Sequence, residues 1–551
     1  MPSLDLLGNL DVWSEVLKYL EISFEFDSES EVKDKRRALL RVALLSPSLT
    51  TSALDVLWQS MTSIEPITCV INAKASTVDE NIIKFLPENS GGYWWLKRAL
   101  NSDDLNRAWE YLARIRHLRT QVGVVKEMGL YATLSHSFGG VVLPSVQSLC
   151  FDFSKAGYVS HWINTIGPLL SSTLKSISYQ NVSASHAGGV DTLQAGLKSR
   201  SLSIIDISYH GYPSSSLLQN CLSFDSLETL KLISAFSGSS IPRYTAGSSI
   251  FEAFESLPKL KELEVDLRVF PLRNSTIETS RASDTFPKTY PSPSLINLHI
   301  AGDASDIAQF LLNGIKSLSL LSLSVTIFQT NGLVWKVVCD RIVSNFPKLR
   351  SLCFRRAGGG IQQLLMQDLS ALLSRTTVES FELSGIPHCF NEANISGMLD
   401  SWPKLHTLSI TNDTSTRFSA TVLIRISHAT HLRHVKLPLE LSVLGTPLPE
   451  EPVAVSRSLV QALTMTSISG APSSLESKIE VASNLLILFP ILERLFTDES
   501  HHSQYLGELE KLVGSFRRMV VTYLRRRELE ERTTKKTEPS RASKEDRRLE
   551  P

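Results

Sequence analysis

The sequence predicts an α/β fold made of repeated units, in which short parallel strands form a ribbon and helices lie outside it. Two observations support this prediction. The chain has 551 residues, which is too long for one compact core, so several domains or an elongated array are expected. A short apolar phrase also recurs along the chain, and stretches with helical spacing separate its copies. Such recurrence indicates a solenoid, whose units stack one on the next.

The recurring phrase is L-x-x-L-x-(L/I/F), often preceded by Pro-Lys or Pro-Ser. Its eleven copies begin at Val146, Leu174, Leu202, Leu227, Leu260, Leu295, Leu318, Leu349, Val378, Leu405 and Leu432. Successive copies begin 23 to 35 residues apart, close to the roughly 20 to 29 residues of leucine-rich repeats. A twelfth, degenerate copy is expected near Leu492, after a gap that interrupts the array.

Each copy has the pattern of a half-buried strand. In Leu263-Glu264-Val265 a polar residue lies between two apolar ones, so one side of the strand should be buried and the other exposed to solvent. Helical spacing follows one copy at Ile307, Phe310, Leu311 and Ile315. One unit cannot bury its apolar face alone, so we expect a leucine-rich-repeat solenoid with a parallel strand ribbon and outer helices. The alternative is a doubly wound α/β domain, but its strands would be continuous apolar runs.

The first 60 residues predict three short helices. Apolar residues recur at helical spacing in three stretches, with Leu10, Trp13, Val16, Leu17 and Leu20 in the first, Leu39, Leu40, Ala43 and Leu44 in the second, and Ala53, Leu54, Leu57 and Trp58 in the third. An acidic insert over residues 24–34 separates the first two stretches, and Ser46-Pro47-Ser48 interrupts the helical pattern before the third. Apolar side chains that these helices cannot bury among themselves should pack against a partner protein or against the solenoid.

This arrangement resembles an F-box, in the variant found at the start of fungal F-box and leucine-rich-repeat proteins. The resemblance rests on the helix from Leu10 to Leu20, the run from Arg37 to Leu49, and the A-L-D-V-L-W that ends at Trp58. It implies that the box binds a Skp-type adaptor, and through it a cullin ubiquitin ligase, while the repeats hold a protein substrate. The adaptor-binding residues would be Leu10, Trp13, Val16, Leu17, Leu20, Leu40 and Leu44. The alternative is a leucine-rich-repeat interaction scaffold without ubiquitin-ligase association, whose N-terminal helices cap the first repeat.

The sequence therefore predicts four segments. Residues 1–60 form an F-box-like helical domain, and residues 61–142 form a helical connector or N-terminal cap. Residues 143–515 form the solenoid. Residues 516–551 are a charged tail expected to be disordered, because it has almost no apolar residues.

Charge and composition limit the partners. Lysine plus arginine and aspartate plus glutamate both total 56, and a net charge of zero excludes a general affinity for nucleic acid or acidic membranes. The six scattered cysteines include no C-x-x-C pair, which predicts free thiols. No signal peptide or stretch of about 20 apolar residues is found, so we expect a cytoplasmic or nuclear protein, a monomer within a complex.

The partner surface should be the exposed, inner wall of the ribbon. Polar residues beside the second apolar position of each phrase would face it, and the predicted partner-binding residues are Glu262, Glu264, Asp266, His299, Arg355 and Lys436. Charges of both signs on this wall suit a protein partner better than a polyanion.

No catalytic motif, cofactor or metal site is predicted. The triplet His428-x-x-His431-x-x-His434 has no neighbouring cysteine or carboxylate to complete a tetrahedral set. The run Gly358–Gly360 matches neither phosphate-loop pattern and is interpreted as a turn. Neither a G-x-S-x-G elbow nor an H-E-x-x-H helix occurs, so we expect a protein without enzymatic activity.

Overall fold

The computed structural model describes most of the chain in two compact units. The first comprises Met1–Gly302 with Asn313–Ser317, and the second comprises Asp303–Leu312 with Leu318–Pro551. The residues that the structure describes are 10–23, 27–73, 81–86, 93–122, 125–154, 167–197, 201–209, 220–221, 223–234, 257–268, 290–313, 315–328, 335–358, 363–411, 417–440, 444, 458–469, 474–497, 504–519 and 522.

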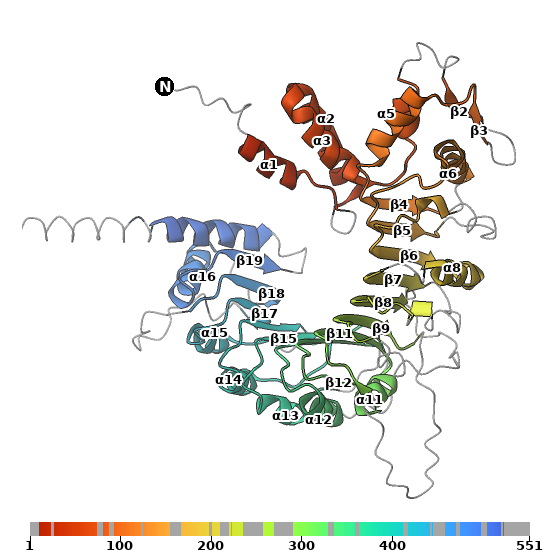
Figure 1. The fold of residues 1–551 in the computed structure, drawn as a ribbon. Coiled ribbons are helices and arrows are strands. Elements are labelled where there is room, and N and C mark those ends of the chain that lie inside the picture. Colours follow the sequence, from red (N-terminus) through yellow and green to blue (C-terminus); the bar gives the residue numbers. More distant parts are fainter. Residues whose placement is uncertain are drawn as a thin grey trace, which may run out of the picture. The chain divides into compact units, whose positions relative to one another are not determined.

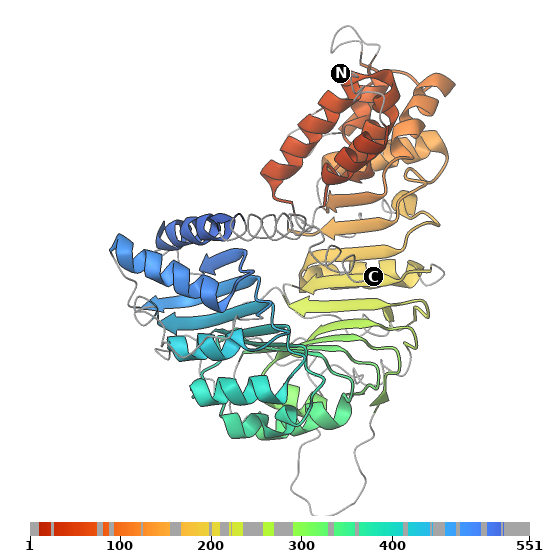
Figure 2. The same cartoon turned by 90° about the vertical axis from the view of Figure 1, so that its left-hand side faces the viewer.

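Fifteen strands form one sheet in which the spatial order of the strands follows their order in the chain (Figure 1). They are β1 (Ser60–Met61), β4 (His117–Gln121), β5 (Ser148–Asp152), β6 (Ser176–Val182), β7 (Ile204–Tyr209), β8 (Thr229–Ser234), β9 (Glu262–Asp266), β11 (Asn297–Gly302), β13 (Ser322–Ile327), β14 (Ser351–Arg356), β15 (Ser380–Ser384), β16 (Thr407–Thr411), β17 (His434–Glu440), β18 (Ala462–Ser469) and β19 (Arg494–Thr497). Within each unit the strands run the same way (Figure 2), which confirms the predicted ribbon of parallel strands.

The alternation of the phrase decides which side of each strand is buried. In β9 Leu263 and Val265 are buried and Glu264 between them is half-exposed. The register places Leu230 of β8 beside Leu263, and Leu298 of β11 on its other side. Equivalent apolar residues therefore stack from repeat to repeat into one continuous interior, and each such side chain contributes about 1.5–3 kcal/mol by its burial.

The seventh copy of the phrase lies two residues later than predicted. Leu318, its predicted first residue, is 60% exposed, whereas Leu320 is fully buried and β13 begins two residues after it. The intervals on either side become 25 residues from Leu295 and 29 residues to Leu349. The local sequence alternates Leu with Ser and fits the phrase in two registers, so only burial against the neighbouring repeats decides between them.

The sheet also extends beyond the predicted array in both directions. In the segment 61–142, predicted as a helical connector, Ile115 is buried just before β4 and Leu118 is buried within β4, in the same pattern as in the other copies. Val460 starts a further copy that forms β18 within the predicted gap, and the degenerate copy at Leu492 forms β19. A helix over residues 504–519 continues past the predicted end of the solenoid at residue 515.

The three N-terminal helices are α1 (Leu10–Tyr19), α2 (Glu29–Leu45) and α3 (Pro47–Gln59). Ser28 caps α2 and forms a reciprocal capping box with Glu31, so the second half of the predicted acidic insert belongs to the helix. Acidic residues in the first turn also suit the positive end of the helix dipole. Ser46 caps α3, and Pro47 occupies its first turn.

The remaining helices lie outside the ribbon. They are α4 (Ile67–Ile71), α5 (Ser102–Leu112), α6 (Val125–Phe138), α8 (Ala184–Leu197), α11 (Ala304–Asn313), α12 (Trp335–Asn345), α13 (Ser370–Leu373), α14 (Glu392–Ser401), α15 (Ala420–Ser427) and α16 (Leu475–Leu488), with 3-10 turns at η2 (Gly167–Leu169) and η3 (Met366–Leu369). Figure 1 shows α6 and α8 on one side of the strands of the first unit, and α12 to α16 one after another along the second. No described helix is long and apolar enough to cross a membrane.

Two small sheets lie beside the ribbon. Strands β2 (Ile83–Leu86) and β3 (Tyr93–Leu96) form an antiparallel hairpin, and β10 (Tyr290–Pro291) pairs with β12 (Ile315–Lys316) in parallel. Of the residues predicted at helical spacing, Ile307, Phe310 and Leu311 are buried in α11. Ile315 is also buried, but in β12 rather than in a helix.

Candidate interaction surfaces

The exposed face of the first unit carries a row of side chains that the strand register places side by side. The row runs through Arg119, Cys150, Ser178, Asp206, Lys231, Glu264 and His299, one from each strand from β4 to β11. A parallel row two residues earlier on each strand runs through His117, Ser148, Ser176, Ile204, Thr229, Glu262 and Asn297. Because residues two apart on a strand face the same side, both rows belong to one surface.

Most of this surface lines a groove of about 1070 Å³. The groove extends from Ser60 of β1 to β9, and at one end it is also lined by the end of α1 and by the connector, the residues that follow α1. Glu21, Ile22 and Ser23 of the connector contribute to this end. The amide of Gln59 donates a 2.7 Å hydrogen bond to the Glu21 carboxylate, which ties the connector to the last residue of α3. We call this space the strand-face groove.

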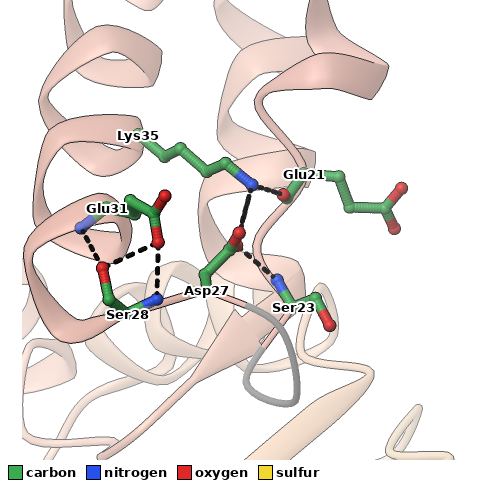
Figure 3. Close-up of polar contacts among 6 residues, drawn as sticks. All are labelled: Glu21, Ser23, Asp27, Ser28, Glu31 and Lys35. Carbon is green, nitrogen blue, oxygen red and sulfur yellow. Dashed lines mark hydrogen bonds and ion pairs between the residues drawn. The ribbon is translucent and has the colours of Figure 1, made fainter. Parts of the chain in front are cut away.

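A set of polar contacts holds the connector in place (Figure 3). The Lys35 ammonium donates to the main-chain carbonyl of Glu21 at 2.8 Å and to both carboxylate oxygens of Asp27 at 2.8 and 2.7 Å. Asp27 in turn accepts a 2.9 Å bond from the main-chain N–H of Ser23. The hydrogen bond from Lys35 lowers the pKa of Asp27, so the carboxylate remains charged near neutral pH. Glu21 and Asp27 are thereby bonded to Lys35 of α2, and Ser23 is held through Asp27.

Lys231 lies close to acidic side chains in the strand-face groove. Towards β9 Lys231 forms an ion pair with Glu262 at 3.1 Å and lies 4.0 Å from Glu264. Asp206 accepts a 3.1 Å hydrogen bond from the Ser178 hydroxyl. Burial disfavours the charged form of Lys231, but the hydrogen bond to Glu262 and the three surrounding carboxylates outweigh it and raise its pKa. The Lys231 ammonium therefore remains charged among these carboxylates.

At the other end of the groove the basic groups already have acidic partners. Arg119 forms a 3.3 Å ion pair with Asp152 of the next strand. Lys18 forms a 2.6 Å ion pair with Glu15 within α1. The pKa of His117 is lowered chiefly by burial, so its ring is neutral near pH 7. The charges of Arg119 and Lys18 are thus already compensated, and the Glu21 carboxylate lines the same end.

Four of the six residues predicted to bind a partner lie in the first unit. Glu262 and Glu264 line the strand-face groove together, and His299 is half-exposed on the strand next to β9. The prediction for Asp266 is wrong, because its side chain is buried and forms a 2.6 Å ion pair with buried Arg268. This carboxylate also accepts a hydrogen bond from the main-chain N–H two residues on, so it closes a turn at the strand end instead of facing outwards.

The other two predicted residues belong to the second unit. Arg355 in β14 is exposed and forms a 3.2 Å ion pair with Glu382 of β15. Lys436 in β17 is half-exposed and lies beside Ser409 of β16. They lie on strands that are not adjacent, so they do not form one cluster.

The residues predicted to bind an adaptor divide into two groups. Leu17 is in the core of the helical segment, and Trp13 and Leu20 pack against that core. Val16, Leu40 and Leu44 are exposed, by 36%, 49% and 86% respectively. The side chain of Leu10 lies outside the described residues. The exposed apolar residues Val12, Tyr19 and Leu45 were not predicted.

Sequence reasoning missed Asp206 and Lys231 of the strand-face groove. Each occupies the same position in its phrase as Glu264, between the second and third apolar residues. The repeat pattern therefore indicates both residues, because the position between the second and third apolar residues faces outwards in every copy.

Nothing among the described residues forms a group of three or more histidine, cysteine or acidic side chains that could hold a metal. His428 and His431 line a cavity of about 230 Å³ between the ends of α14 and α15. Of the predicted glycine turn, only Gly358 lies within the described residues, and it packs against the main chain of Phe328. Burial raises the pKa of the Cys150 thiol to about 11, which makes it a poor nucleophile near neutral pH.

A parallel ribbon in chain order, with one phrase per strand and helices outside it, defines the class: the chain is a leucine-rich-repeat solenoid preceded by a short helical segment. No protein-family model matches it, and no curated protein matches it.

Three solved structures illustrate what the chain is similar to. An internalin from Listeria monocytogenes is 13% identical with a TM-score of 0.30, over 79% of this chain and 94% of that one. A structure of the Rad7 and Elc1 complex in yeast gives 13% identity and a TM-score of 0.36, over 76% and 96%. A leucine-rich-repeat protein of Leptospira interrogans is 14% identical with a TM-score of 0.33, over 73% of this chain and 93% of that one. The fold assignment itself rests on the strands and their registers.

Proposed function

We propose that the protein is the substrate-recognition subunit of an SCF-type cullin ubiquitin ligase. In this proposal residues 1–60 bind a Skp-type adaptor, residues 61–515 include the repeats that hold a protein substrate, and residues 516–551 are a charged tail. The role requires a cytoplasmic or nuclear protein, and it needs no chemistry from the chain itself. The alternative remains a leucine-rich-repeat interaction scaffold without ubiquitin-ligase association.

The observation that carries the proposal is the apolar surface of the N-terminal helices. The three helices already have a core of their own. Leu40 and Leu44 nevertheless lie one turn apart on the exposed side of α2, and Val16 is exposed on α1. Covering a leucine fully is worth about 1.5–3 kcal/mol, so two leucines on one helix face can anchor a partner helix.

The test is capture of the full-length protein by a purified Skp-type adaptor. We expect the double variant Leu40→Asp with Leu44→Asp to lose capture by about tenfold or more, because each aspartate would place a charge in an apolar interface. Both side chains are exposed, so the variant should keep the thermal stability of the unchanged protein. Leu17→Asp is unsuitable, because Leu17 is in the core and its loss would unfold the segment.

A matched control is the double variant Leu318→Asp with Leu475→Asp. These leucines are 60% and 66% exposed and belong to the second unit. They should leave capture unchanged. If the unchanged protein is not captured at all, or if both double variants are captured equally well, the receptor proposal fails and the scaffold alternative is favoured.

A further inference from the structure

The turns that lead into strands β14 to β17 carry an excess of basic side chains. These turns are residues 346–350, 374–379, 402–406 and 428–433, and helices α12 to α15 end just before them. They lie outside the exposed strand face, at the edge of the second unit where the strands begin. The four turns and the last four residues of each helix contain six lysines and arginines, Lys348, Arg350, Arg375, Lys404, Arg425 and Arg433, and two acids, Glu379 and Asp400.

Both acids in this set already have a basic partner. Glu379 forms a 3.3 Å ion pair with Arg350 of the neighbouring turn. Asp400 at the end of α14 forms an ion pair with Arg425 of α15. These two pairs compensate each other's charges, so neither acid is left to neutralise the remaining cations.

A basic residue beside a helix end can serve the helix itself, because it can donate hydrogen bonds to the last carbonyl groups. Arg375 does so, with a 2.7 Å hydrogen bond to the main-chain carbonyl of Val343 in α12. Lys348, Lys404 and Arg433 are exposed, and within the described part of the chain their side chains form no hydrogen bond or ion pair. Their charges are therefore available to a partner. We call these three side chains the turn row.

Main-chain hydrogen bonds hold the four turns side by side. The N–H of Arg433 donates to the carbonyl of His406 at 2.8 Å, and the N–H of His406 donates to the carbonyl of Glu379 at 2.7 Å. Three intervals of about 4.8 Å therefore separate the turn of Lys348 from that of Arg433, which gives roughly 14 Å. One small anion cannot contact both ends, whereas an extended polypeptide covers this distance with about four residues.

A cavity lies between the turns that carry Lys404 and Arg433. It is the cavity of about 230 Å³ described above, and residues of both turns line it. This volume is below the roughly 300–1000 Å³ of most small-molecule pockets, so the cavity suits a single side chain of a bound segment. Its lining from these turns combines polar and apolar residues, including His428, Thr430, His431, Pro403 and Leu405.

The position of Glu379 favours a polypeptide over a nucleic acid. Glu379 lies on the turn before β15, between the turns of Lys348 and Lys404. A nucleic-acid strand carries a phosphate at every nucleotide, so it would place a negative charge against this carboxylate. A polypeptide can place a neutral residue there and carboxylates against the cations on either side. The net charge of zero also gives the chain no general attraction for polyanions.

We propose that the turn row binds an acidic segment of a protein partner, whose carboxylates pair with Lys348, Lys404 and Arg433. A neighbouring side chain of that segment enters the cavity beside His428 and His431. This surface adds a second recognition element to the receptor role proposed above, and it does not depend on the adaptor.

The experiment uses the full-length protein, without any adaptor, and fluorescent nonapeptides of glycine and serine that carry either three glutamates or three lysines. Binding is followed by fluorescence polarisation at about 50 mM salt, where exposed charges are screened little. We expect the glutamate peptide to bind at least about tenfold more tightly than the lysine peptide, because three cations of the turn row attract one and repel the other.

The decisive variant is the triple change Lys348→Gln, Lys404→Gln and Arg433→Gln, which should weaken binding of the glutamate peptide by about tenfold. The matched control is Arg116→Gln, Lys175→Gln and Lys259→Gln. These three are also exposed basic residues in turns before strands, but their strands β4, β6 and β9 are not adjacent. The control changes the net charge equally and should keep the affinity, and thermal unfolding shows whether both variants fold.

A second variant should strengthen binding, which damage to the fold would not do. Glu379→Gln removes the acid within the row and leaves Arg350 without its partner, so the affinity for the glutamate peptide should rise about threefold. Its control is Glu228→Gln in the first unit, which removes the partner of Lys261 from a 2.8 Å ion pair and should leave the affinity unchanged.

Several results would overturn the inference. They are the absence of binding, equal affinity for the two peptides, undiminished binding by the triple variant, and an equal loss in its control. Tighter binding of a single-stranded RNA nonamer, or binding of a phosphoserine peptide without binding of the glutamate peptide, would also overturn it. Because no adaptor is present, failure here leaves the adaptor-capture result unaffected. Loss of adaptor capture with intact peptide binding would instead refute the ligase role and keep the turn row.

Discussion

At the scale of single residues, the burial of His388 should make the stability of the protein depend on pH. Its ring is buried after β15, stacks on Phe390 at 4.7 Å and accepts a 3.2 Å hydrogen bond from the main-chain N–H of that residue. Burial lowers the pKa of His388 to about 4. The ordinary value is about 6.5, so the unfolded chain binds a proton between these values and the folded protein does not.

Stability should therefore be complete above about pH 6.5 and fall as the pH approaches 4. The difference of about 2.5 pKa units corresponds to about 3 kcal/mol in all. We expect His388→Asn to lose much of this pH dependence, because asparagine is not protonated in this range and its Oδ1, which is bonded to Cγ like the imidazole Nδ1, can still accept the hydrogen bond from the main-chain N–H of Phe390. Urea unfolding at neutral pH and near pH 4.5 measures the effect. Equal pH slopes for the variant and the unchanged protein would show that His388 is not responsible.

At the scale of elements, the position of the phrase determines where its strand begins. In each copy the strand begins two residues after the first apolar residue, which lies buried beneath the neighbouring repeats. Leu260 precedes β9 and Leu349 precedes β14 in this way, and Leu320 precedes β13. The first apolar residue is thus part of the interior although it lies outside the strand.

This relation gives a test of the register in the seventh repeat. We expect Leu320→Ala to cost about 2–5 kcal/mol of unfolding free energy, because it removes a fully buried side chain and leaves a cavity. Leu318→Ala removes the same atoms from a side chain that is 60% exposed and should change stability by less than about 0.5 kcal/mol. Chemical denaturation of both variants provides the comparison, and equal losses would contradict the structural register.

At the scale of the whole molecule, the chain is a series of repeats, and each repeat contacts mainly the repeats next to it. In such an array local damage spreads by nearest-neighbour interfaces instead of through one common core. The described strands pair in chain order, so each has partners that are close in sequence. Opening of one region should therefore leave distant repeats intact.

We expect Ile410→Asp, which places a charge in the interior beneath β16, to abolish hydrogen-exchange protection in β15 to β17. Strands β5 to β7 should keep their protection in the same variant. Hydrogen exchange followed by mass spectrometry on the full chain distinguishes local from global loss. Simultaneous loss in both regions would mean that the chain unfolds as one cooperative unit.

The alternation of apolar and polar residues by itself determined the fold class. A strand with period two has only two faces, so the pattern at Leu263 and Val265 fixed which side is buried and that Glu262 and Glu264 face outwards. The same reasoning could not recognise β4, because Thr120 occupies an apolar position of its phrase. That threonine is buried and donates a 2.7 Å hydrogen bond to Glu127 of α6, whose pKa is raised chiefly by burial.

Only the tertiary structure decided which residues are available at the surface. Leu17 and Leu44 are both apolar and both lie on amphipathic helices, yet one is in a core and the other is 86% exposed. Asp266 continues the outward pattern of its strand but turns inwards to Arg268. Exposure depends on which neighbours arrive from elsewhere in the chain, and spacing within one segment carries no information about them.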